Sequence, residues 1–191
     1  MSDRDGSSVD DLTSGTVDDL AAAYEREEPF DMVEREHTET LPRAFADGEF
    51  GRRDAEWVVQ WYYRRRAVPD AERRAAEERF LDNDYEAMVD AITGAAAASD
   101  RERKLERLTA LTGVDVAVAS AFLAFTHPEA YVAVGDREWE GLRAAGELAA
   151  PSPDPITPAD YWQYLDAVTA VADRIDRDPW TVYRALWRLG G

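Results

Sequence analysis

A short hairpin between two apolar helices constrains the fold of this chain more than any other stretch of its sequence. Leu108 and Leu111 continue a leucine pattern at helical spacing, and this pattern stops at Thr112. A second apolar helix is predicted over residues 116–125. The few residues between the two helices allow only a tight turn, and Gly113 supplies the backbone freedom that such a turn needs.

The rest of the chain also has helical periodicity, and no segment of useful length alternates as a strand does. We therefore predict an all-α protein, with a disordered acidic tail at 1–16 and a single domain at 17–191. The helix-hairpin-helix is expected at about 101–126. Within the domain, the densely charged segment 34–39 predicts a loop, and a short helix is expected over 42–46.

The composition describes a strongly acidic protein, with a net charge of −18 over 191 residues. We interpret this acidity as adaptation to a salt-rich cytoplasm, so it does not by itself exclude a nucleic-acid partner. No signal peptide or membrane span is visible, and a cytoplasmic location is expected. The absence of cysteine excludes disulfides and thiolate metal sites. We expect neither a metal site nor a cofactor.

An aromatic and basic helix is predicted over residues 52–66, and it has two interpretations. Trp57 and Trp61 lie at the spacing of a buried helix face, which favours a core role over stacking on nucleic-acid bases. The helix ends in three arginines, which either clamp phosphate or simply favour the negative end of the helix dipole. These three arginines are Arg64, Arg65 and Arg66.

A second basic group precedes the hairpin on the predicted exposed face of its first helix. Arg101, Lys104 and Arg107 belong to this group, and Lys104 is the one lysine of the chain. A run of charges is usually only a solvated helix face. This one directly adjoins the hairpin, so it is also a candidate surface for a nucleic-acid backbone.

The hairpin residues resemble a known family. The sequence from Leu111 through Gly113 to Asp115, followed by the small Ala119, is similar to the hairpin of the helix-hairpin-helix DNA glycosylases related to endonuclease III. In that family a catalytic aspartate follows the first hairpin glycine by a little over twenty residues. Asp136 follows Gly113 by 23 residues (136 − 113).

The resemblance implies an all-α glycosylase-like fold, DNA as partner, and a place in base excision repair. It also implies that the hairpin backbone amides meet a DNA phosphate, here through Gly113, Val114 and Val116. Asp136 would position or activate water while the base departs from a nucleotide flipped out of the duplex. The expected activity is therefore hydrolysis of an N-glycosidic bond.

The chain departs from the family pattern at three points. Ala117 occupies the position of the nucleophilic lysine of bifunctional members, so no strand-cleaving lyase activity is expected. Asp115 replaces the second hairpin glycine, and a carboxylate there disfavours a phosphate unless a cation lies between. The lack of cysteine excludes the iron–sulfur cluster of some relatives.

Two alternatives remain open from the sequence. Asp136 stands where a helix N-cap belongs, and such a cap stabilises a helix by about 1 kcal/mol without any chemistry. The whole protein is then either a monofunctional glycosylase-like enzyme or a non-catalytic all-α interaction protein that keeps only the fold.

Overall fold

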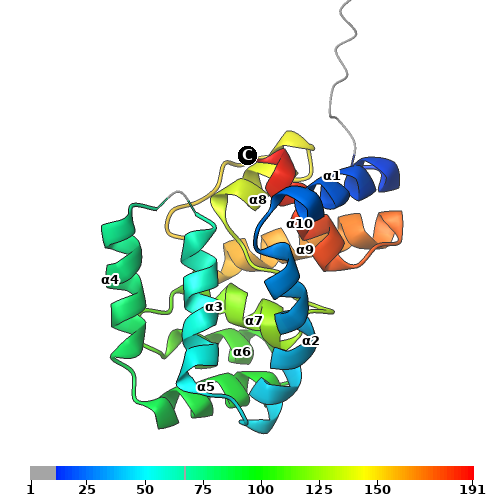
Figure 1. The fold of residues 1–191 in the computed structure, drawn as a ribbon. Helices are drawn as coiled ribbons and strands as arrows, with labels where there is room; N and C mark the ends of the chain where they lie inside the picture. The colour runs from blue at the N-terminus through cyan, green and yellow to red at the C-terminus, as the bar shows by residue number, and fades with distance from the viewer. Residues whose placement is uncertain (1–11, 67) are drawn as a thin grey trace, which may run out of the picture.

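The computed structural model describes residues 12–66 and 68–191, in which helices joined by short connectors make up the fold (Figure 1). This confirms the predicted all-α class, and no strand occurs in these two ranges. In chain order the helices are α1 (Ser14–Glu27), α2 (Asp31–Asp47), α3 (Arg52–Arg64), α4 (Asp70–Leu81), α5 (Tyr85–Ala97), α6 (Arg101–Thr109), α7 (Val116–Thr126), α8 (Asp136–Ala144), α9 (Pro158–Ile175) and α10 (Pro179–Leu189).

The helices form two groups around a continuous core. Helix α10 packs on α1, α8 and α9, which lie together in the upper part of Figure 1, while α2 to α7 form the lower part. Helix α7 is the centre of the lower group and also contacts α9. Its sequence is apolar on every side, and all but one of its eleven residues are buried. A helix that is apolar all round has to be surrounded by others.

A tight turn at residues 110–115 joins α6 and α7, where the sequence predicts the hairpin. Gly113 has φ +77°, a left-handed conformation that favours glycine. A Cβ atom at this position would lie 3.0 Å from the backbone nitrogen of Phe80. The Asn83 side chain holds the turn through hydrogen bonds to both the amide and the carbonyl of Thr112, at 2.9 and 2.8 Å. The hairpin is thus packed tightly on the end of α4.

The predicted loop at 34–39 is wrong, since α2 runs without interruption through this segment and contains Pro42. The helix accommodates these charged residues because most of them face solvent. Glu34 is fully buried, whereas Glu39 is exposed. The charge pattern of the sequence therefore did not distinguish the buried carboxylate of Glu34 from the exposed charges beside it.

The first helix begins earlier than the sequence predicts. Helix α1 starts at Ser14, with Thr13 as its N-cap, and Leu12 is buried with 2% of its surface exposed. The predicted boundary of the disordered tail, at residue 16, therefore lies too far along the chain. Its residues 1–11 lie outside the described part of the chain.

Candidate functional site

Asp136 lies at the boundary of two hollows, and Arg66 lines both of them. The smaller hollow has a volume of about 210 Å³ and lies between the start of α7 and the start of α8. Asp115 and Ala117 of the hairpin region line it together with Asp136. Tyr62 and Tyr63 of α3, Gly135, and residues 153–156 complete its wall. The fold thus brings the hairpin and the candidate aspartate to one cavity.

Asp136 is the first residue of α8 and not its N-cap, which is Gly135. The predicted N-cap position is therefore wrong by one residue, because the extended Gly135 completes the connector before the helix begins. The Asp136 side chain is exposed, and its Oδ1 accepts a hydrogen bond of 2.8 Å from the Ser152 hydroxyl. Ser152 also donates its backbone N–H to Glu140 Oε1, at 3.2 Å. The linker thereby fixes the carboxylate at the helix start.

The larger hollow has a volume of about 500 Å³ and lies between the end of α3, the start of α8 and the end of α10. Arg137 lies over the Trp187 ring, with its guanidinium carbon 3.5 Å from the ring centroid. Burial lowers the pKa of Arg137, and within the described residues no carboxylate pairs with it. Glu138 is 1% exposed and lies beside Arg65 and Arg66 at the inner wall.

Arg65 belongs to a buried polar network and does not lie on an open surface. Its Nη1 donates to Glu34 Oε1 and to the Tyr24 hydroxyl. Glu34 also accepts hydrogen bonds from the Tyr24 hydroxyl, at 2.7 Å, and from the Trp61 indole, at 2.8 Å. Burial raises the pKa of Tyr24, so its hydroxyl stays protonated and donates. Arg65 therefore neutralises Glu34 inside the protein.

The three arginines at the end of α3 consequently have different environments. Arg64 is exposed, Arg65 is buried, and Arg66 is partly buried. Arg66 donates from Nη2 to the Val134 carbonyl, at 2.8 Å, and its guanidinium lies over the Tyr62 ring. Arg66 lines both hollows together with Asp136, whereas Arg65 lines only the larger one. The structure also confirms the core interpretation of Trp61, which is 2% exposed.

The basic group on α6 does not form one exposed face. Arg101 turns toward α9, where it pairs with Asp166 at 3.2 Å. Lys104 is only 6% exposed, so its predicted place on an exposed face is wrong. Its ammonium group donates to the Ala95 carbonyl at the end of α5, at 3.1 Å, and contacts His127 Nε2 at 2.7 Å.

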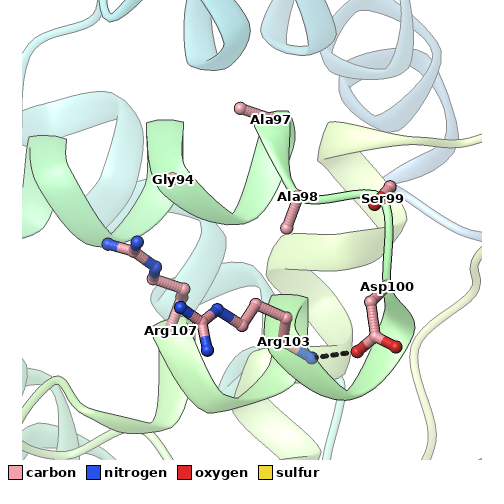
Figure 2. Close-up of a pocket in the computed structure, with 7 residues that line it drawn as sticks. All are labelled: Gly94, Ala97, Ala98, Ser99, Asp100, Arg103 and Arg107. Atoms are coloured by element: carbon pink, nitrogen blue, oxygen red, sulfur yellow. Dashed lines mark hydrogen bonds between the residues drawn. The ribbon is translucent and has the colours of Figure 1, made fainter.

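Arg107 remains exposed. Figure 2 shows it beside Arg103, where both side chains border a surface hollow of about 630 Å³ next to Gly94 on α5. The backbone N–H of Arg103 donates to Asp100, which caps α6. This hollow thus offers two exposed guanidinium groups, but it lies apart from the residues that line the hollows at Asp136.

The hairpin amides are partly occupied by bonds within the protein. The Val114 amide donates to the Leu111 carbonyl, at 3.2 Å. The Asp115 carboxylate caps α7 by accepting from the Val118 amide, at 2.8 Å. Gly113 packs on α4, as described above, and Val116 begins α7. The negative charge of Asp115 therefore lies at the N-terminus of α7.

Several residues of the site were not singled out from the sequence. Arg137 and Glu138 read as ordinary charges in the first turn of a helix, and Ser152 as part of a stiff linker between prolines. Trp187 continues the apolar helical spacing of Trp180 and Tyr183, which indicates only a core residue. Their common role depends on contacts across distant segments, for which one sequence holds no local signal.

No group of side chains suited to a metal ion is found among residues 12–66 and 68–191. In the same part of the chain, every helix is too short or too polar to cross a membrane. Comparisons with protein-family models, with curated proteins and with solved structures find no match for this chain. The site is therefore interpreted from its geometry and from the hairpin resemblance alone.

Proposed function

We propose that this protein binds nucleic acid and hydrolyses an N-glycosidic bond in the manner of a monofunctional DNA glycosylase, with Asp136 as its catalytic carboxylate. The observation that carries the proposal is the shared cavity of Asp136 and the hairpin residues Asp115 and Ala117. The hairpin resemblance relates these segments only by their separation along the chain. Their meeting at one cavity is an independent reason to regard them as one site.

The chemistry follows from the residues at this cavity. Asp136 is exposed and held by the Ser152 hydroxyl, so its second carboxylate oxygen is free to orient water or to stabilise a positively charged sugar. Ala117 lines the same cavity and provides no amine. The one lysine of the chain, Lys104, is buried against the end of α5. Water is thus the nucleophile, and the product is an abasic site in an intact strand.

A specific observation favours the second candidate, a non-catalytic interaction protein. Three aspartates, Asp115, Asp136 and Asp154, line the smaller cavity together with the single cation Arg66. The negative charges of these aspartates repel a phosphate backbone unless salt or a bound cation screens them. In this alternative the hairpin serves only to pack α6 and α7 on α4.

The two candidates are separated by testing base release directly. Oligonucleotides that carry a set of damaged or mismatched bases are incubated with wild type and with Asp136→Asn at high potassium chloride. Alkali then cleaves the strand at abasic sites. We expect cleavage after alkali with wild type, none without alkali, and a loss of at least about a hundredfold in Asp136→Asn, the usual contribution of a positioned acid or base.

Asp173→Asn is the matched control, since Asp173 is exposed on α9 and lines neither cavity. It removes the same charge by the same chemical change and should retain wild-type activity. Base release that persists in Asp136→Asn would refute the catalytic role. The absence of release from every substrate, combined with no detectable binding at low or high salt, would favour the interaction protein.

A further inference from the structure

A further surface hollow, of about 470 Å³, lies between α6, the start of α7 and the start of α9, and we call it the α6–α9 groove. Its walls come from segments that are distant in the sequence, and α9 also contacts α7 directly. The apolar part of the lining consists of Leu105, Val116, Ile156, Pro158 and Trp162. Leu105 and Trp162 are buried, whereas the other three are partly or fully exposed. The groove therefore offers an apolar surface to a partner.

The charged residues that line the α6–α9 groove are all acidic. They are Glu102 and Glu106 on α6 and Asp115 at the N-cap of α7, and all three are exposed. The two glutamates are four residues apart, so they share one face of α6. Among the described residues no basic side chain lines the groove. An apolar hollow with only carboxylates at its rim is complementary to an apolar group that carries a positive charge.

Arg101 shows that a cation is held at the edge of this surface. Its guanidinium carbon lies 4.9 Å from the centroid of the Trp162 ring, and its Nε is 3.3 Å from Glu102 Oε1. The face of a tryptophan ring attracts cations, so ring and carboxylate act together on the guanidinium. Arg101 itself does not line the groove, and it compensates only the charge of Glu102 there.

Glu106 and Asp115 keep most of their charge available for an external partner. Glu106 Oε2 is 3.9 Å from Arg103 Nη1, and both side chains of this pair are largely exposed. Such a loose exposed pair contributes little. Asp115 accepts a hydrogen bond from the Val118 amide and forms no ion pair with a side chain of the described residues. A cation from outside the chain would therefore find two carboxylates beside one apolar surface.

We infer that the α6–α9 groove binds a basic segment of a partner protein, which places an apolar side chain on Leu105 and Trp162 and an arginine or lysine against Glu106 or Asp115. The net charge of −18 adds a general attraction toward a basic partner. The same carboxylates repel the backbone of a nucleic acid. The inference requires no glycosidic chemistry, so it stands apart from the proposed function.

The experiment is a titration of the ¹⁵N-labelled full chain with a synthetic glycine-serine peptide that contains a leucine with an arginine on each side. Molar potassium chloride screens the general attraction and leaves only charges in contact. The indole N–H signals are followed by NMR, and Trp162→Phe assigns the signal of Trp162. We expect a saturable shift of this signal.

Two altered peptides test the two parts of the groove separately. Citrulline in place of arginine keeps the shape of the side chain and removes its charge, and it should weaken binding by about threefold or more. Alanine in place of leucine removes the apolar contact and should weaken binding by about tenfold or more. Equal binding of the arginine and citrulline peptides would overturn the inference, whatever the protein variants show.

Protein variants place the peptide on the molecule. Thr109 is exposed at the groove, and its hydroxyl bonds only to carbonyls of its own helix. Thr109→Arg should fill and repel, and thus abolish the shift of Trp162. Glu106→Gln should weaken binding by about threefold or more. The matched control is Glu86→Gln, since Glu86 is exposed on α5 and does not line the groove.

The control variant should bind the peptide as wild type does, and an equal loss in both glutamine variants would refute a specific site. Unchanged binding in Thr109→Arg would place the peptide elsewhere and also refute it. The absence of a saturable Trp162 shift would overturn the inference. So would a shift of the same signal by a DNA duplex in place of the peptide. Base release from DNA bears only on the proposed catalysis, so the two proposals fail independently.

Discussion

Removal of the Glu34 carboxylate is the sharpest test of how the fold is held together. Glu34 is fully buried and accepts hydrogen bonds from the Tyr24 hydroxyl, the Trp61 indole and Arg65. Truncation by Glu34→Ala leaves the Arg65 guanidinium inside the protein without its closest anion. Breaking a buried pair from one side costs about 3–5 kcal/mol, a large share of the about 5–15 kcal/mol that stabilises a typical domain.

The assay is urea unfolding in molar potassium chloride, followed by far-UV circular dichroism because the loss of helix reports the global transition. Asp47→Ala is the control on the same helix, since Asp47 forms an exposed pair with Arg43 and should lower the free energy of unfolding by less than about 1 kcal/mol. The double variant Glu34→Leu/Arg65→Met removes both charges and should recover at least about 2 kcal/mol. A loss below about 1 kcal/mol in Glu34→Ala, or no recovery in the double variant, would refute the reasoning.

Two further predictions concern His127 and the hairpin. Burial, followed by the nearby charge of Lys104, lowers the pKa of His127 from its ordinary value of 6.5, so the unfolded chain binds a proton more readily than the folded one. The stability contributed by neutral His127 should therefore be lost as pH falls through 6.5 toward the lowered value. Urea unfolding should show that the free energy of unfolding of wild type exceeds that of His127→Gln by less at about pH 5.5 than at about pH 7.5. A difference that stays constant or grows as pH falls would contradict this prediction. Gly113→Ala should lower the free energy of unfolding by about 1–3 kcal/mol, because alanine is strained at φ +77° and its Cβ would press on Phe80. A neutral effect in the same assay would show that the turn relaxes.

The sequence was sufficient for those features that depend on near neighbours. The hairpin could be predicted because two apolar patterns stop at either side of one glycine, and the all-α class because helical periodicity recurs in every long segment. The start of α8 was placed within one residue of Gly135, which is the usual uncertainty of a helix end.

The environments of charged residues could not be predicted in the same way, since they depend on partners far along the chain. Lys104 belongs to a charged stretch that reads as a solvated face, yet its ammonium group caps α5. Arg65 continues a basic cluster, yet it pairs with Glu34, 31 residues earlier. The segment around Glu34 was itself expected to be a loop, so the sequence did not predict the ion pair between Glu34 and Arg65. Periodicity records which face of a helix is apolar, but it cannot show which charge is neutralised inside.

The acidity of the chain affects nucleic-acid binding differently at the two hollows beside Asp136. Nucleic-acid backbones are attracted by uncompensated cations, and the small cavity has three aspartates against Arg66. Molar salt screens charges beyond about 3 Å, so at molar salt recognition has to rely on contacts at hydrogen-bond distance. At the larger hollow, side-chain atoms of Arg65, Arg66 and Glu138 have no hydrogen-bond partner in the described part of the chain and would supply such contacts. For such a protein, specific hydrogen bonds to an extruded base would contribute more to binding than phosphate contacts, and affinity should depend more on the identity of the base than on the salt concentration.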